Sequence, residues 1–356
     1  AAIKSPGGFE FFGGISKGIE KRTKVKTRII ASALRELVET SDNVIVMGHR
    51  FGDLDSIGSA IALAAAVRQL GKHSVVCVSR ARNLARCLID MEEQAGVTDL
   101  FVEETTALEM MTLKTLVIIT DTHNLALVES AQVYQNAKTV VVIDHHRKVV
   151  NFIDNAVIFY HEPFASSASE MVTELLQYLG DNIQVSKTEA EALLAGIMLD
   201  TKNFVLKTGV RTFEAAAFLR RMGADTVEVR QLFSSTMESY QRKARLVSAA
   251  EIYKSCAIAS SDFSSDDLRV VAPQAADELL GISGVKASFV LYEVGGMVNI
   301  SARSMGQINV QVIMEQLGGG GHLTMAGAQL EGIDLEKARQ MLLDAVDKYQ
   351  EEYGKK

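Results

Sequence analysis

Short apolar runs alternate with helical segments along the first half of the chain, and this alternation constrains the fold most. We predict strands at Asn43–Met47, Ser74–Val78, Leu116–Ile119 and Thr139–Ile143, because each run has strand length and is rich in β-branched or other apolar residues. A helix rich in Ala, Ile and Leu is predicted at Asp55–Leu70. Strands that alternate with helices are typical of a mostly parallel sheet with helices on both faces. The chain is therefore predicted to be an α/β protein.

A second, smaller α/β region is predicted after residue 253. Helical patterns dominate from Ser167 to about Ile252, and strand-like segments then return. The predicted strands are Cys256–Ser260, Leu268–Val271, Lys286–Val294 and Met297–Ala302, and the predicted helices are Asn309–Gln316 and Leu335–Tyr349. We therefore predict a linker or remnant of an upstream domain at 1–22, a larger domain at 23–236, a connecting helix at 237–252 and a smaller domain at 253–356.

Composition and charge limit the partners of such a chain. Its 356 residues carry a formal net charge of -7 and 47% are hydrophobic, which is typical of a globular protein and excludes disorder. An acidic chain lacks the broad basic surface of a duplex nucleic-acid binder, although a local basic channel could hold a short nucleotide. Three cysteines without CxxC spacing indicate reduced thiols and no zinc–cysteine site. The sequence has no apolar run of ~18 residues and no initiator Met, so we expect a fragment cut from a larger protein.

Histidines and aspartates gather where the predicted strands end. The first strand leads into Gly48–Ser56, the third into Thr120–His123 and the fourth into Asp144–Arg147. The carboxyl ends of parallel strands line the crevice where ligands bind, so three separate segments bring these groups to one edge. Taken singly, Asp55 could be only a helix N-cap, and a lone His at a strand end is usually a satisfied polar residue. Together, so many carboxylates would repel each other unless cations neutralised them.

The sequence therefore predicts a metal site. Asp200 is a further candidate ligand, because it ends the otherwise apolar predicted helix that includes Glu191–Asp200. The candidate ligands are His49, Asp53, Asp55, Asp121, His145 and Asp200. Six ligands exceed what one ion needs, so two ions are indicated, bridged by a carboxylate. Oxygen-rich sites with imidazole and without thiolate suit Mn²⁺ or Mg²⁺ better than structural zinc.

The motif Asp144-His145-His146, with the upstream His49, Asp53, Asp55 and Asp121, resembles the DHH phosphoesterase superfamily. The segment Gly318-Gly319-Gly320-Gly321-His322, preceded by Ser301-Ala302-Arg303-Ser304, resembles the DHHA1 substrate-binding domain. The segments Gly18–Lys26 and Val46–Arg50 are closest to the GdpP type of cyclic di-AMP phosphodiesterase. Many DHH proteins have Asn-Pro between the first His and Asp, where this chain has Phe51-Gly52.

The resemblance implies a role for each ligand. His49, Asp53 and Asp121 would hold one Mn²⁺. The other ion would be held by Asp55, Asp121, His145 and Asp200, with Asp121 as the bridge. Asp144 would lie behind the ligands and orient His145.

The resemblance also implies an enzyme that hydrolyses cyclic di-AMP to linear 5′-pApA through attack by a hydroxide activated by two metal ions. Asp121, His145 and His146 would be catalytic, with His146 protonating the leaving oxygen and Arg147 contacting phosphate. For His146 and Arg147, simple packing or solvation of their loop is an equal alternative. A nanoRNase or pAp phosphatase acting on short oligonucleotides is the alternative enzyme. A nucleotide sensor with a vestigial metal site is the non-enzymatic one, although every expected ligand is present.

The second domain would bind substrate through Arg303, Gly319, Gly320, Gly321 and His322. The glycines could instead form only a helix C-cap and turn. Four in succession exceed what a cap needs, and backbone N–H groups without Cβ neighbours can approach a phosphate closely. For adenine stacking, Phe51, Phe204 and Tyr292 are open candidates, and the sequence assigns none.

The resemblance extends to cellular context. Proteins of this type carry two membrane-spanning helices, a PAS domain and a degenerate diguanylate-cyclase domain upstream of this region. We therefore expect a catalytic part in the cytoplasm, attached to the cell membrane only through segments outside this sequence, and a homodimer.

Overall fold

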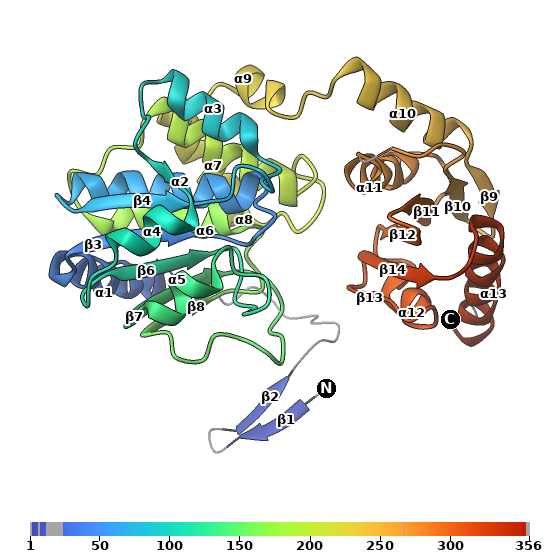
Figure 1. Ribbon diagram of the computed structural model, residues 1–356, viewed down its shortest axis with the longest axis horizontal. Coiled ribbons are helices and arrows are strands. Elements are labelled where there is room, and N and C mark those ends of the chain that lie inside the picture. Colours follow the sequence, from blue (N-terminus) through green and yellow to red (C-terminus); the bar gives the residue numbers. More distant parts are fainter. Residues whose placement is uncertain (1, 6–7, 12–23, 266, 354–356) are drawn as a thin grey trace. The chain divides into compact units, whose positions relative to one another are not determined.

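The computed structural model describes residues 2–5, 8–11, 24–265 and 267–353, and it divides into two compact units at Ser234. The first unit contains a six-stranded sheet with the order β5-β4-β3-β6-β7-β8. Every neighbouring pair in this sheet is parallel. The strands are β3 Asn43–Met47, β4 His73–Cys77, β5 Phe101–Val102, β6 Leu116–Thr120, β7 Thr139–Asp144 and β8 Ile158–His161. The predicted α/β class and parallel sheet are confirmed (Figure 1).

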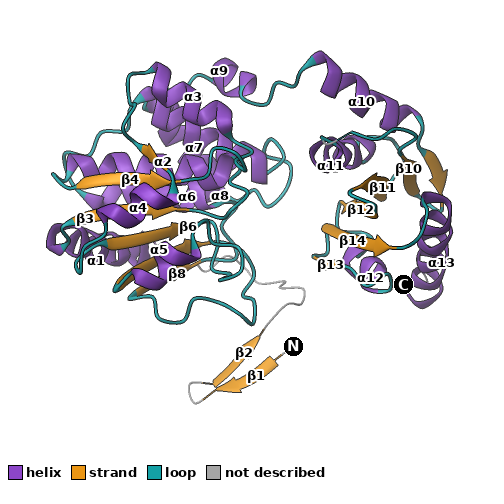
Figure 2. Cartoon of the chain, in the orientation of Figure 1, coloured by secondary structure: helices purple, strands orange, loops and turns teal. Residues whose placement is uncertain are grey.

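Helices cover both faces of this sheet, as Figure 2 shows. They are α1 Lys24–Thr40, α2 Leu54–Gln69, α3 Arg86–Gln94, α4 Glu104–Met110, α5 Ala131–Asn136, α6 Ala168–Leu179, α7 Lys187–Asp200, α8 Val210–Arg221 and α9 Thr226–Gln231. Successive residues of the buried strands point to opposite faces of the sheet. Val44 and Val46 of β3 pack into one apolar cluster, together with residues of α1, α2, α6 and α7. Ile45 and Met47 pack into the other, with residues of α4 and α5. This period of two explains why an uninterrupted apolar run makes a strand buried on both faces.

Helices α2 and α7 approach each other unusually closely, because glycine occupies the contact on both sides. A Cβ on Gly58 of α2 would lie 2.5 Å from the carbonyl oxygen of Ala192. A Cβ on Gly196 of α7 would lie 2.8 Å from the Cα of Asp55. Both distances are shorter than any ordinary carbon contact, so the close approach requires glycine at both positions.

The second unit contains a mixed sheet with the order β13-β14-β12-β11-β10-β9. Its strands are β9 Glu251–Tyr253, β10 Cys256–Ser260, β11 Ala287–Val294, β12 Met297–Ser304, β13 Gly320–Gly321 and β14 Met325–Glu331. Its helices are α10 Met237–Ser248, α11 Leu268–Leu279, α12 Val310–Glu315 and α13 Leu335–Tyr353. Only β10 and β11 pair in parallel; the other pairs are antiparallel.

One predicted strand is wrong. Leu268–Val271 begins helix α11, although its Val-Val pair suggested a strand. The buried positions Leu268, Val271, Ala272, Ala275 and Leu279 follow a helical spacing of three to four residues. The helical face therefore extends well beyond the four residues that suggested a strand.

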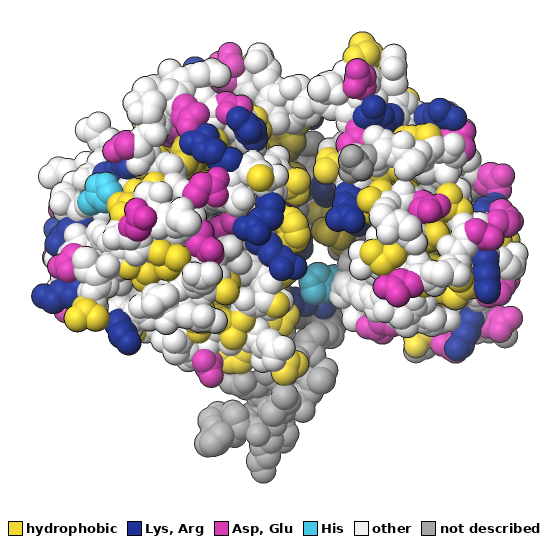
Figure 3. All heavy atoms as spheres, viewed as in Figure 1, with side chains coloured by type: hydrophobic (Ala, Val, Ile, Leu, Met, Phe, Trp, Pro, Cys, Tyr) yellow, Lys and Arg dark blue, Asp and Glu magenta, His cyan; other side chains and the backbone are white. Residues whose placement is uncertain are grey.

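At the N-terminus, β1 Ala2–Ser5 and β2 Gly8–Phe11 form an antiparallel hairpin within the range predicted as a linker. The rest of 1–22 lies outside the described residues. On the face shown in Figure 3, Lys and Arg side chains are scattered among Asp and Glu in both units. No helix in the described parts of the chain is both long and apolar enough to cross a membrane.

Candidate metal centre

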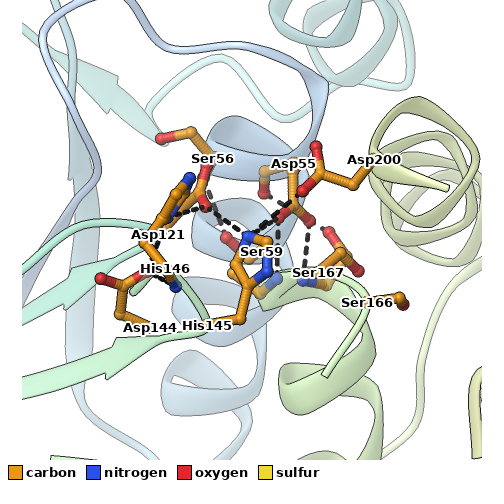
Figure 4. Close-up of polar contacts among 12 residues, drawn as sticks. Asp55, Ser56, Ser59, Asp121, Asp144, His145, His146, Ser166, Ser167 and Asp200 are labelled. Atoms are coloured by element: carbon orange, nitrogen blue, oxygen red, sulfur yellow. Dashed lines mark hydrogen bonds and ion pairs between the residues drawn. The ribbon is translucent and has the colours of Figure 1, made fainter. Parts of the chain in front are cut away.

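The candidate ligands meet at the carboxyl edge of the sheet in the first unit. His49 follows β3, Asp121 follows β6, and His145 follows β7. Asp53 caps α2 through hydrogen bonds from the backbone N–H groups of Asp55 and Ser56, both at 3.0 Å. Figure 4 shows Asp200, from the end of α7, beside Asp55 and His145.

The first group of potential ligands comprises His49, Asp53 and Asp121, which can bring one donor atom each within 4.8 Å of one another. The Nε2 atom of His49 lies 3.4 Å from Oδ2 of Asp121 and 3.9 Å from Oδ2 of Asp53. Burial alone would lower the pKa of His49, but the Asp121 carboxylate outweighs it and raises the pKa to about 9. Burial and the charge of Asp121 raise the pKa of Asp53 to about 6.

The second group comprises Asp55, His145 and Asp200. The Nε2 atom of His145 lies 3.2 Å from Oδ2 of Asp200 and 3.7 Å from Oδ2 of Asp55. The same nitrogen lies 3.3 Å from Oδ1 of Asp121. Asp121 therefore reaches both groups: its Oδ2 faces His49 of the first group and its Oδ1 faces His145 of the second. Burial would lower the pKa of His145, but Asp121 and Asp200 raise it well above its usual value.

The backbone of Asp121 is held in an uncommon conformation. Its φ is 60°, in the left-handed region, and its N–H donates to the carbonyl of Ile143 at 2.9 Å. Burial would raise the pKa of Asp121, but His145 and His49 hold it below its usual range. Such backbone conformations are concentrated at functional sites, where the surrounding structure maintains them.

Buried polar atoms without hydrogen bonds indicate that these residues fit a cation. Among the described residues, Oδ1 of Asp121 and both ring nitrogens of His145 are buried and form no hydrogen bond. Buried groups of this kind are nearly always paired, and leaving them unpaired costs about 1–3 kcal/mol each. Carboxylate and imidazole donors that converge without mutual hydrogen bonds are the donor set of a divalent ion.

Asp55 also anchors a helix. Its two carboxylate oxygens accept hydrogen bonds from the backbone N–H groups of Ala168 at 2.7 Å and Ser169 at 2.8 Å, in the first turn of α6. The prediction that Asp55 could cap a helix concerned α2, whereas the residue that caps α2 is Asp53. The α6 turn therefore fixes the orientation of a carboxylate that also faces His145.

Asp144 makes different contacts from those predicted. Its carboxylate interacts with the ring of His123 through Oδ2 and with Nδ1 of His146 through Oδ1, the latter at 2.8 Å. No hydrogen bond from Asp144 to His145 is present in the described structure, because His145 forms none through its ring. His123 also accepts the backbone N–H of Val149 at 3.1 Å. No role was predicted for His123 from the sequence; its position two residues after Asp121 was the available signal.

The glycine run of the second unit has structural reasons of its own. Gly318, with φ of 75°, ends α12 as a C-cap glycine does. Cβ atoms on Gly319 and Gly321 would lie 2.2 Å and 2.5 Å from the carbonyl oxygens of Gly327 and Met325, so close strand pairing requires glycine there. Gly320 differs, because a Cβ there would meet nothing within 4 Å.

Two predicted substrate-binding arginines lie in different units. Arg147 follows the Asp144-His145-His146 motif and is half-buried. Arg303, on β12, has a side chain that is only 13% exposed, and its Nε lies 3.3 Å from Oδ1 of Asp277. Its Nη1 donates to the carbonyl of Ala302 at 3.0 Å.

Each unit of the chain matches a known domain family. Residues 43–197 match the N-terminal domain of the DHH family, and residues 255–352 match the DHHA1 domain. The chain therefore contains a DHH domain followed by a DHHA1 domain. It is 45% identical over 354 residues to "Cyclic-di-AMP phosphodiesterase GdpP" of Geobacillus thermodenitrificans, covering 98% of this chain and 54% of that protein. The DHH chain described here thus spans about half the length of the curated relatives of this kind that it matches.

Two more distant relatives match this chain over nearly their whole length. The chain is 27% identical over 333 residues to "Bifunctional oligoribonuclease and PAP phosphatase NrnA" of Thermus thermophilus, covering 92% of this chain and 95% of that protein. An exopolyphosphatase-related protein of Bacteroides fragilis has the same fold, with a TM-score of 0.76 and 21% identity over 95% of this chain and 99% of that one.

Proposed function

We propose that this chain is a Mn²⁺-dependent phosphodiesterase that hydrolyses cyclic di-AMP to linear 5′-pApA. One observation carries the proposal: Asp121 reaches both groups of potential ligands and has a buried oxygen without a hydrogen bond. Cyclic di-AMP is proposed as the substrate because the curated relatives are named as cyclic-di-AMP phosphodiesterases.

In this proposal the first ion is held by His49, Asp53 and Asp121, and the second by Asp55, Asp121, His145 and Asp200. Two divalent ions there would generate a nucleophile from water at neutral pH and neutralise charge on the phosphoryl oxygens. Mn²⁺ is proposed over zinc because the donors are mainly oxygen, and Mg²⁺ would suit the same donors.

In this proposal His146 donates a proton to the leaving oxygen. Its Nδ1 is bound by Asp144, which fixes the ring and leaves Nε2 for the substrate, and the side chain is 45% exposed. Desolvation and the charge of His145 oppose protonation, but the Asp144 carboxylate outweighs them and raises the pKa of His146. A raised pKa favours the protonated imidazole that a general acid requires.

We further propose that Arg147, Arg303, Gly319, Gly320, Gly321 and His322 contact the substrate. Gly320 allows this to be tested without disturbing the fold. Gly320→Ala has room for its Cβ and should keep the melting temperature of the second unit while raising KM, if the backbone approaches a phosphate. Gly319→Ala is the matched control for structural damage, because its Cβ would overlap β14. An unchanged KM in Gly320→Ala would remove Gly320 from the binding surface.

The central test is product analysis combined with metal titration. Purified protein should bind two equivalents of Mn²⁺ and convert cyclic di-AMP to 5′-pApA. Asp121→Asn should weaken binding of both equivalents, since the Asp121 carboxylate lies close to His49 of one group and His145 of the other. Wild-type turnover by Asp121→Asn in Mn²⁺ would refute the two-metal proposal, and metal binding without turnover would favour a sensor.

A second candidate is a nanoRNase or pAp phosphatase, favoured by the full-length similarity to the Thermus thermophilus relative. Parallel assays with cyclic di-AMP, pApA and pAp separate the two, because a cyclic-di-AMP phosphodiesterase should cleave the cyclic substrate fastest.

The proposal also includes a homodimer. It further includes attachment to the cell membrane through segments outside this sequence, with the catalytic part in the cytoplasm. Light scattering of this chain and fractionation of the full-length protein test them.

A further inference from the structure

The loop between two predicted metal ligands carries an exposed aromatic side chain. His49 and Asp53 face the same group of potential ligands, so the chain between them turns out of the site and back. Phe51 lies at the middle of this turn and is 48% exposed. Its Cα can be no more than about 7 Å from the Cα of either ligand, since each ligand is two positions away along the chain.

This turn is fixed in place by backbone hydrogen bonds. The N–H of Arg50 donates to the carbonyl of Leu127 at 2.8 Å, and the carbonyl of Gly52 accepts from Leu84 at 2.9 Å and Ala85 at 3.2 Å. A Cβ on Gly52 would lie 2.9 Å from Cδ1 of Ile57, so the turn also packs tightly on α2. The position of Phe51 relative to the ligands is therefore set by the fold.

Burial separates Phe51 from the other aromatic candidates for base stacking. Tyr292 is 7% exposed and lies in an apolar cluster of the second unit. Phe204 is half-buried, packs against the main core and stacks on Phe213 with ring centroids 5.6 Å apart. Phe51 belongs to none of the apolar clusters of the described residues, and its one ring contact there is the guanidinium of Arg50, 5.1 Å from the ring centroid.

We propose that Phe51 stacks on a nucleobase of the substrate, with the guanidinium of Arg50 beside the ring. An exposed aromatic paired with a cation is the combination that binds single-stranded nucleotides, because bases present a π-face and phosphates a negative charge. Because Phe51 lies next to the candidate ligands, it would bind the base of the nucleotide whose phosphate is attacked. The inference rests on the proposed function and adds to it the residue that selects nucleotides over other phosphodiesters.

Binding of a fluorescent nucleotide tests this directly. The probe is 5′-pApA with one adenine replaced by 2-aminopurine, whose fluorescence is quenched by stacking, measured with Ca²⁺ in place of Mn²⁺. Base–aromatic stacking of about 1–3 kcal/mol corresponds to a Kd about 5- to 150-fold higher in Phe51→Ala, with the quenching lost. Phe51→Tyr should restore both. Tyr240→Ala is the matched control, because Tyr240 is 53% exposed with Lys243 5.5 Å from its ring and is not part of the turn between His49 and Asp53.

A kinetic comparison adds a second readout. The ratio of kcat/KM for cyclic di-AMP to that for bis(p-nitrophenyl) phosphate, which has no base, should fall at least about fivefold in Phe51→Ala. An unchanged ratio, or wild-type affinity and quenching in Phe51→Ala, would overturn the inference. So would an absence of quenching in the wild-type protein. Failure of the proposed function would look different: the wild-type protein would leave cyclic di-AMP intact, whether or not it quenched the probe.

Discussion

Replacing Gly196 with Ala would test whether the contact between α2 and α7 positions the metal ligands. The new Cβ would lie 2.2 Å from Oγ of Ser169 and 2.8 Å from both Cα and Oδ1 of Asp55. Restoring the contact with Asp55 from 2.8 Å to an ordinary 3.4 Å requires a displacement of about 0.6 Å. Metal–ligand distances tolerate only about 0.2 Å. The displacement would move Asp55 or shift α7, which carries Asp200 four residues further on.

Two measurable effects should follow. Overpacking of this kind costs about 1–3 kcal/mol, which lowers the melting temperature of a domain this size by about 2–12 °C. Affinity for Mn²⁺, measured by calorimetry at a temperature where the protein is folded, should fall about 10- to 100-fold, the range seen when the support of a ligand is disturbed.

The control is Leu63→Ala, two turns beyond Asp55 on α2. Leu63 is fully buried, and its truncation costs about 2–5 kcal/mol without touching a ligand. This variant should be at least as destabilised as Gly196→Ala and should bind Mn²⁺ normally. If Gly196→Ala were destabilised but bound Mn²⁺ as tightly as the wild type, the reasoning that helix packing positions the ligands would be refuted.

Three further predictions concern the same unit. His123→Gln removes the ring that contacts Asp144, so kcat should fall about 10- to 100-fold while Mn²⁺ stoichiometry stays at the wild-type value; a parallel loss of bound metal would contradict a role through Asp144. Because the folded-state pKa of His49 is raised from 6.5 to about 9, its contribution to stability is complete below pH 6.5 and is lost as the pH rises through 9. Metal-free protein should therefore melt at lower temperature at pH 9 than at pH 6.5, and Mn²⁺ should reduce this difference; equal melting temperatures in EDTA would argue against it. Burial raises the pKa of Cys77 to about 12, so this thiol should resist a thiol reagent at pH 8 until the protein unfolds, and rapid labelling of native protein would count against the structure.

Much of the fold could be predicted because the relevant patterns are local. The run at Asn43–Met47 is strand β3 and that at Cys256–Ser260 is strand β10, with the predicted bounds. Other elements were not predicted correctly: β8 and β14 were missed, and the first residues of α11 suggested a strand. A pattern of four residues cannot distinguish a period of two from one of 3.6.

The convergence of the six candidate ligands could be predicted from the sequence for a specific reason. Parallel strands all end at the same edge of the sheet, so groups that follow the strands must meet there. Asp121 and His145 each follow such a strand directly, and His49 follows β3 after Gly48. The order of elements along the chain was sufficient, and no knowledge of side-chain packing was needed.

The sequence by itself therefore determined the α/β class, the edge where the ligands gather and the acidic character that suits a cation. Only the tertiary structure decided that Asp144 contacts His123, that Asp55 accepts hydrogen bonds from the first turn of α6, and that Phe51 is exposed while Tyr292 is buried. The physical reason is distance along the chain. Periodicity and strand order follow from neighbouring residues, whereas the partner of a given carboxylate or ring depends on how segments more than 20 or 100 residues apart pack together.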